Sequence, residues 1–97
     1  MTKHNGLDLS DLENELKSIF VDIARCRMTR LKRSAKVRED LGIDSFTALE
    51  ILVAVENRFT LKIMESELDK FITFGDVSDF LFKQLSSKDK IGLSSSL

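Results

Sequence analysis

The chain has 97 residues, of which 42% are hydrophobic and 32% are charged, and its formal net charge at pH 7 is −1. This length and composition predict one small globular domain rather than a disordered segment. A single cysteine excludes an internal disulfide, and without a CxxC or a Cys/His cluster there is no metal site to propose. No hydrophobic run reaches the roughly 18 residues of a membrane span, and the N-terminus does not resemble a signal or transit peptide. We therefore expect a cytoplasmic protein in a reducing compartment.

The small net charge conceals a strong segregation of charges. Residues 25–38, called the basic segment below, contain seven Lys or Arg side chains and no acid, whereas residues 39–79 contain ten acids and three bases. Exposed charges act over about one Debye length, roughly 8–10 Å. Any charged surface that binds a partner is therefore expected to be local.

Helical periodicity predicts a first helix over residues 11–25. Ser10 and Glu13 have the spacing of a capping box at its start. We expect Cys26 to be buried where this helix ends. The side chains expected to face the core are Leu12, Leu16, Ile19, Phe20 and Ile23.

A second helix is predicted over residues 45–58, and a third over residues 73–85. The second helix is expected to be the most buried element, because its hydrophobic stripe is wide. The helix is marked out by Phe46, Leu49, Leu52, Val53 and Glu56, and its hydrophobic stripe is widened by Ile51 and Val55. Thr73 and Asp76 predict the capped start of the third helix. Its expected core side chains are Phe74, Val77, Phe80, Leu81 and Leu85.

These elements predict an all-α fold: a small up-and-down bundle of three main helices plus one short helix at 65–71, with a long loop between helices one and two. The long loop covers residues 26–43, and loops of this length in small domains are often functional. The expected organisation is a flexible N-terminus at 1–9, a helical domain at 10–86 and a disordered C-terminal tail at 87–97.

Ser45 is expected at the first position of the second helix, directly after Asp44 as its N-cap. Gly42 lies in the turn before them and suits a backbone that needs a positive φ or close packing. The N–H groups and the dipole at a helix N-terminus stabilise a phosphate, which would suit a phosphodiester on this serine. An Asp-Ser pair that simply begins a helix is the alternative. No histidine or lysine lies beside Ser45 in sequence, so catalysis by this serine has no local support.

The stretch DLGIDS, followed by an amphipathic helix ending in ENRF and then by ITFGDV, resembles the acyl carrier protein family over residues 9–85. The family carries 4′-phosphopantetheine on the serine of this motif. The resemblance therefore implies that Ser45 is the attachment site, that Asp44 is its neighbour in the motif, and that residues 10–86 are an acyl carrier domain. It implies a carrier of acyl thioesters and not an enzyme.

The resemblance also implies partners and an acyl pocket. The partners would be a phosphopantetheinyl transferase, which loads the arm from coenzyme A, and acyl-transferring and condensing enzymes of fatty-acid, lipid or related biosynthesis. The carrier is expected to be a monomer. The residues placed near a sheltered acyl chain are Val55, Ile63, Leu68 and Phe71. Plain core packing is the alternative role for these four side chains.

Several residues depart from the family pattern, and they bear on which enzymes bind. Phe46 replaces the usual leucine, while Thr47, Asn57 and Arg58 stand where acids are common. The acids that remain, and that we expect to face partner enzymes together with Phe46, are Asp44, Glu50 and Glu56. These departures and the basic loop favour a specialised carrier.

The basic segment could in principle bind nucleic acid or an anionic membrane. It contains no aromatic residue and adjoins an acidic region that would repel phosphates, so we expect no nucleic acid. Met28 and Leu31 would permit an amphipathic turn on a membrane, but we do not expect one. We expect Arg30, Lys32 and Arg33 to select partner enzymes. A helical interaction module with an unmodified serine, and a basic-loop binder of anionic surfaces, stay open as alternatives.

Overall fold

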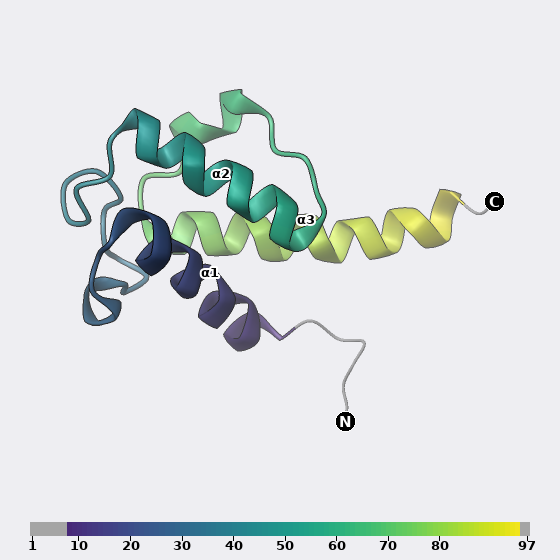
Figure 1. Ribbon diagram of the computed structural model, residues 1–97. Coiled ribbons are helices and arrows are strands. Elements are labelled where there is room, and N and C mark those ends of the chain that lie inside the picture. The colour runs from purple at the N-terminus through teal and green to yellow at the C-terminus, as the bar shows by residue number, and fades with distance from the viewer. Residues whose placement is uncertain (1–7, 96–97) are drawn as a thin grey trace.

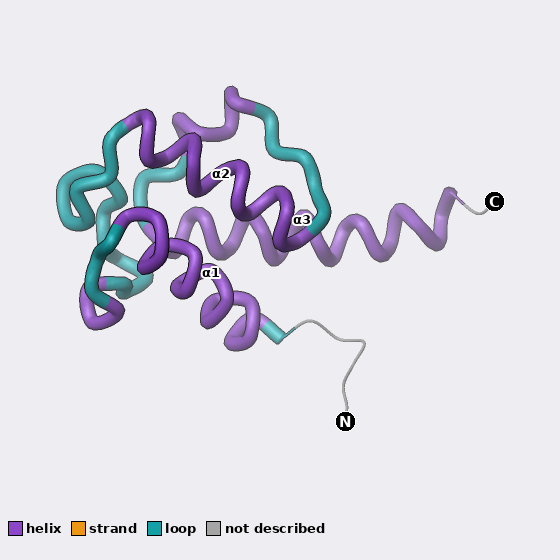
Figure 2. The backbone as a smooth tube through the Cα atoms, in the orientation of Figure 1, coloured by secondary structure: helices purple, strands orange, loops and turns teal. Residues whose placement is uncertain are grey.

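The computed structural model describes residues 8–95. Its elements are α1 (Leu9–Ala24), η1 (Met28–Arg30), α2 (Ser45–Phe59), η2 (Glu65–Lys70) and α3 (Phe74–Ser95), where η denotes a short 3₁₀ helix (Figure 1). Within the described residues there is no strand, only an isolated bridge between Lys36 and Thr73. The predicted all-α class is confirmed. The long loop 26–43 lies at the end of the molecule where α2 begins (Figure 2).

The capping box predicted at Ser10 and Glu13 is not formed. The N-cap of α1 is Asp8 instead. The Glu13 carboxylate accepts hydrogen bonds from the side chain of Arg33 and from the buried hydroxyl of Ser78, the latter at 2.7 Å. Because these partners belong to loop 26–43 and to α3, Glu13 connects three segments of the chain rather than capping its own helix.

The core forms where α1 packs against α2 and α3. The ring of Phe20 meets that of Phe74 edge to face, with centroids 5.2 Å apart. The predicted core residues of α1 and α3 are confirmed as buried or partly buried: Leu12, Leu16, Ile19, Phe20, Ile23, Phe74, Val77, Phe80, Leu81 and Leu85. Loop 26–43 adds four more buried side chains, Leu31, Ala35, Leu41 and Ile43.

The predicted buried face of α2 is wrong in part. Ile51, Leu52 and Val55 are buried. Three side chains of the predicted stripe are instead exposed: Phe46 by 71%, Leu49 by 38% and Val53 by 53%. Hydrophobic side chains occur on nearly every side of α2, so periodicity alone could not select the face that packs. Nor is α2 the most buried element, because six of the seven largest fully buried side chains belong to α1 and α3.

Loop 26–43 is attached to the first turn of α3. The first N–H groups of a helix have no partner within the helix. Here the N–H of Phe74 donates to the carbonyl of Ala35, and the N–H of Gly75 donates to the carbonyl of Arg33, both at 2.9 Å. The loop therefore completes the hydrogen bonding of α3, and the start of α3 determines the path of the loop.

The side chain of Arg33 strengthens this attachment. Its guanidinium donates two hydrogen bonds of 2.7 Å to Asp79 of α3 and another to Glu13 of α1. These hydrogen bonds, above all those to Asp79, raise the pKa of Arg33 above its ordinary value. Exposed ion pairs are individually weak, but this one joins a loop and two helices at a single side chain.

The start of α3 is as predicted, but its end is not. Asp76 donates its N–H to the hydroxyl of Thr73 at 3.1 Å, and Thr73 donates its N–H to the carboxylate of Asp76 at 3.0 Å. The helix continues to Ser95, through most of the segment 87–97 for which the sequence predicts a disordered tail (Figure 1). Once packing has nucleated a helix, each further residue adds to it at little cost, and no proline stops it here. Residues 1–7, which include most of the predicted flexible N-terminus, lie outside the described residues.

Gly75→Ala tests the attachment of the loop. Within a helix, replacing glycine by alanine is normally favourable by about 0.5–1 kcal/mol. At Gly75, however, an added Cβ would lie 2.9 Å from the carbonyl oxygen of Arg33. Because that neighbour is backbone, we expect a loss of stability of about 1–3 kcal/mol in urea unfolding. Gln84→Ala, an exposed position of the same helix, should stay within about 0.5 kcal/mol of wild type. A stabilised Gly75→Ala would contradict the docked position of the loop.

Candidate functional site

Ser45 follows a turn that is anchored by buried side chains on both sides. Leu41 and Ile43 are buried, and Gly42 between them has a φ of +66°. The N–H of Gly42 donates to the carbonyl of Arg38 at 3.0 Å and closes the turn. The predicted need for glycine at position 42 is confirmed, and the turn leads directly into α2.

Asp44 is the N-cap of α2, as predicted. One carboxylate oxygen accepts a hydrogen bond from the N–H of Thr47 at 2.8 Å. This bond, together with an interaction with the Thr47 hydroxyl, lowers the pKa of Asp44 from its ordinary value. The carboxylate is therefore ionised at neutral pH and committed to the first turn of the helix.

The hydroxyl of Ser45 is exposed at the first position of α2. Among the residues that the structure describes, none forms a hydrogen bond with this hydroxyl. A nucleophilic serine is activated by an adjacent base. The described residues place no such base at Ser45.

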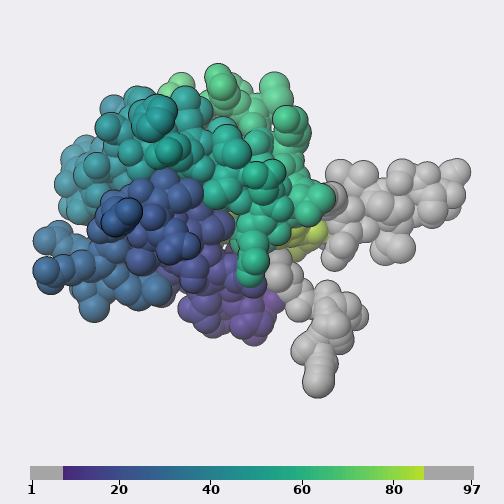
Figure 3. All heavy atoms as spheres, viewed as in Figure 1, coloured from purple at the N-terminus to yellow at the C-terminus, as the bar shows by residue number. Residues whose placement is uncertain are grey.

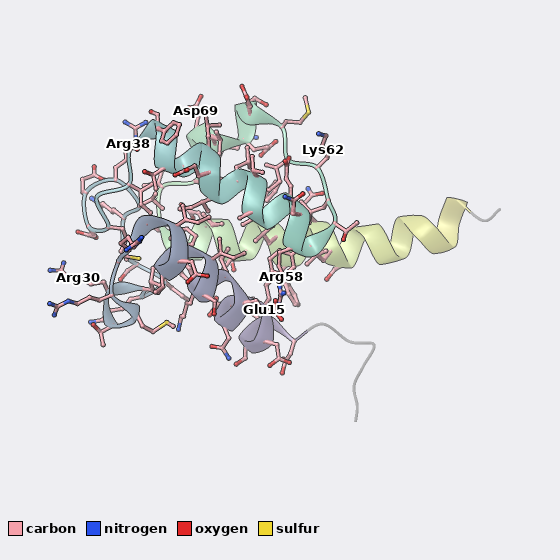
Figure 4. The ribbon with its side chains drawn as sticks, in the orientation of Figure 1. Glu15, Arg30, Arg38, Arg58, Lys62 and Asp69 are labelled. Carbon is pink, nitrogen blue, oxygen red and sulfur yellow. The ribbon has the colours of Figure 1, made fainter. Side chains whose placement is uncertain are left out.

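A cavity of about 310 Å³ lies beside Ser45. Its exposed polar residues are Arg38, Asp44, Ser45, Glu65 and Asp69. Its partly or fully buried hydrophobic residues include Leu52, Val55, Ile63, Leu68, Phe71 and Phe80. Figure 4 shows Arg38 and Asp69 near the end of α2 at which Ser45 lies. The cavity therefore has a polar edge and a hydrophobic interior, which is typical of small-molecule sites.

The four residues expected near an acyl chain all line this cavity: Val55, Ile63, Leu68 and Phe71. Phe71 also packs edge to face against Phe80 of α3, with ring centroids 5.0 Å apart. The cavity thus lies between α2, the segment around η2, and α3. Sequence reasoning missed Arg38 as a lining residue, because there it is one of seven similar cations in the basic segment.

The residues expected to bind partners on α2 have different environments. The side chain of Phe46 is 71% exposed, and Glu50 is exposed without an ion pair among the described residues. Glu56 is half-buried, and its carboxylate accepts a hydrogen bond from the N–H of Ile63 at 2.8 Å. Glu56 therefore positions the chain that follows α2, which leaves Glu50 as the carboxylate available on the outer surface.

The three cations expected to select a partner also differ. Arg33 is engaged by Glu13 and Asp79 within the chain. Arg30 and Lys32 are exposed and form no ion pair with any described residue. Figure 4 shows Arg30 extending away from the helices, and in the space-filling view of Figure 3 the loop forms an edge of the molecule.

Other kinds of site receive little support in the part of the chain that is described. Cys26 is half-buried rather than buried, and its thiol lies 3.7 Å from the carbonyl oxygen of Phe20. Desolvation by burial raises the pKa of this thiol, which disfavours the reactive thiolate. No described helix is long and hydrophobic enough to cross a membrane, and no described cluster of His, Cys, Asp or Glu could hold a metal ion.

Comparison with known proteins agrees with this geometry. A family model described as a phosphopantetheine attachment site matches residues 14–81. The chain is 32% identical over 68 residues to the acyl carrier protein of Campylobacter fetus subsp. fetus, which covers 70% of this chain and 88% of that protein. It is 31% identical over 68 residues to the acyl carrier protein of Wolinella succinogenes, covering 70% of this chain and 90% of the relative.

The fold, the exposed serine and the matched segment define a phosphopantetheine-binding carrier domain. The chain belongs to the acyl carrier protein family. The cofactor of the family is 4′-phosphopantetheine, bound covalently. Acyl carrier proteins carry groups rather than catalyse reactions, and they interact with transferases and biosynthetic enzymes.

Asp44→Asn tests the cap that presents Ser45. The variant retains an oxygen that can cap α2 but cannot titrate. The pKa of Asp44 in the folded state lies below the unfolded value of about 3.9. The ionised carboxylate therefore contributes stability that is complete above the unfolded pKa and is lost as the pH falls through the folded pKa. Wild type should be more stable than the variant at neutral pH, and urea unfolding should show the difference shrinking in acid. A difference that does not change with pH would contradict the assignment.

Proposed function

We propose that this chain carries acyl groups as thioesters on a 4′-phosphopantetheine arm attached through the hydroxyl oxygen of Ser45. The observation that carries the proposal is the position of this hydroxyl, exposed at the first residue of α2 and lining a largely hydrophobic cavity. The N–H groups and dipole of a helix N-terminus favour a phosphodiester there by about 0.3–1 kcal/mol. The arm supplies a thiol to which the acyl group is bound.

Within this proposal the chain positions and shields its cargo, and its partners perform the chemistry. Val55, Leu68 and Phe71 would cover the hydrophobic part of an acyl chain that enters the cavity. Since Ser45 has no hydrogen-bonded base among the described residues, the base for loading would come from the phosphopantetheinyl transferase. The other proposed partners are acyl-transferring and condensing enzymes of fatty-acid, lipid or related biosynthesis. A monomer in the cytoplasm would suit this role.

The outer face of α2 is the proposed docking surface for these enzymes. Phe46 directly follows Ser45, and Val53 lies two helical turns further along the same side of the helix, with 53% of its side chain exposed. Glu50 lies beside them and is available for a basic partner. A hydrophobic strip next to a carboxylate offers both contact area and electrostatic steering.

The exposed cations of the basic segment are proposed to select among these enzymes. Arg30 and Lys32 belong to the loop that leads to the turn before Ser45, at the end of the molecule where α2 begins (Figure 2). An enzyme with an acidic rim would be attracted to them, whereas one with only a basic docking patch would be repelled. A repulsive contact of this kind would suit a specialised carrier rather than a general one.

Ser45→Ala should abolish modification. Incubation of the purified chain with coenzyme A and a broad-specificity phosphopantetheinyl transferase should add the mass of one phosphopantetheine, as measured on the intact protein. The alanine variant should gain none, because the acceptor oxygen is removed. Ser34→Ala and Ser66→Ala, at two other exposed serines, should be modified as wild type is. Addition to Ser45→Ala, or failure of wild type to be modified by any transferase, would refute the proposal.

Charge changes on the two surfaces should act in opposite directions on an enzyme with a basic docking patch. Glu50→Lys should slow loading at low salt, whereas the double variant Arg30→Ser, Lys32→Ser should be loaded faster than wild type. Both differences should fade as salt screens exposed charges. Initial rates of loading across a range of salt concentrations provide the measurement.

The contrary result for the basic segment is specific. Retention of wild type on DNA or on anionic vesicles that is lost in the double variant, with no change in loading or in acyl-transfer rates, would make the segment a surface anchor.

A further inference from the structure

Arg38 lines the same cavity as Ser45, although it belongs to the basic segment. Its backbone carbonyl accepts a hydrogen bond from the N–H of Gly42. The turn therefore brings the backbone of Arg38 beside the residues that lead into α2. Figure 4 shows its side chain near the start of α2, on the side where Asp69 also lies. A guanidinium is thus placed next to the proposed attachment point.

This guanidinium has no ion-pair partner among the described residues, unlike two other arginines of the chain. Arg33 is paired with Glu13 and Asp79, and Arg58 is paired with Glu15. Arg38 is exposed and forms no such contact. Three carboxylates line the same cavity, those of Asp44, Glu65 and Asp69, yet none of them forms an ion pair with it.

We propose that Arg38 binds the phosphodiester of the arm carried by Ser45 and so holds the arm at the edge of the cavity. This inference rests on the proposed function of Ser45. A guanidinium binds two phosphate oxygens with parallel hydrogen bonds, a geometry that a lysine ammonium lacks. The phosphodiester adds a negative charge to an edge that already has three carboxylates and one cation. Without Arg38, that edge would be anionic throughout, and only the N-terminal N–H groups of α2 would oppose the repulsion.

Thermal unfolding of apo and holo proteins tests the contact without any partner enzyme. We would measure the melting temperature of the unacylated holo form and subtract that of the apo form. The proteins compared are wild type, Arg38→Gln and Arg30→Gln. Because the holo form bears no acyl group, the phosphodiester is the only anion that modification adds. Arg30→Gln is the matched control, because it removes the same charge from the same loop outside the cavity lining.

At low salt, the holo-minus-apo difference for wild type and Arg30→Gln should exceed that for Arg38→Gln by about 2–6 °C for a domain of this size. At about 1 M salt, where the Debye length is roughly 3 Å, the excess should diminish. The phosphorus NMR signal of the phosphodiester should shift in Arg38→Gln and not in Arg30→Gln. Arg38→Lys, which keeps the charge without the planar geometry, should fall between wild type and Arg38→Gln.

Equal holo-minus-apo differences in all three proteins, with an unmoved phosphorus signal, would overturn the proposal. The proposal would also be overturned if Arg38→Gln lowered the melting temperatures of the apo and holo forms equally relative to wild type, since the role of Arg38 would then be structural. If Arg38→Gln is not loaded, the comparison of Arg38→Lys with wild type decides by the same criteria. Failure to modify wild type at all would instead refute the proposed function of Ser45, so the two failures are distinguishable.

Discussion

Two backbone hydrogen bonds, from the N–H groups of Phe74 and Gly75 to the carbonyls of Ala35 and Arg33, connect loop 26–43 to the start of α3. The loop is long, and ordering it costs conformational entropy at every residue. The unpaired N–H groups of a helix terminus would in turn be costly to bury. The hydrogen bonds between the two segments therefore help to offset the entropy lost by the loop and satisfy the N–H groups of the helix. After this contact the chain continues through the turn at Gly42 into the start of α2.

The same contact explains why α3 lacks a side chain at position 75. A carbonyl can approach the helix closely only where no Cβ intervenes, and an added Cβ at Gly75 would lie 2.9 Å from the oxygen of Arg33. The side chain of Arg33 then extends to Asp79, one helical turn further along, and to Glu13 across the interface with α1. Arg33 thus contacts α3 through both its carbonyl and its side chain, and α1 through its side chain.

Features determined by neighbours in sequence could be predicted, and features determined by distant neighbours could not. The Thr73 and Asp76 cap, the Asp44 cap and the positive φ of Gly42 each depend on a few consecutive residues. Glu13 has the spacing of a local cap but binds Arg33 and Ser78, which are 20 and 65 residues away. Long-range partners of this kind leave no periodic or spacing signal.

The candidate site shows the same division. The position of Ser45 at the start of α2 could be predicted from local sequence, and the four cavity residues could be predicted because the family resemblance implies an order of helices. The packed face of α2 could not, because a helix that is hydrophobic on most sides gives periodicity no contrast. Its orientation depends on α1 and on the segment that follows it, including the hydrogen bond between Glu56 and Ile63.

Because of the cavity beside Ser45, the hydrophobic interior of this domain is not completely filled by its own side chains. Its buried wall includes Leu52, Val55 and Ile63, side chains that in a filled core would meet other side chains across the gap. Under the proposed function, an acyl chain would supply those missing contacts, at about 0.8 kcal/mol for each methylene group buried. The acyl chain would then pack as part of the hydrophobic core. The folding stability of the carrier would rise with the length of the chain it shelters, until the space is full and further methylene groups extend into solvent.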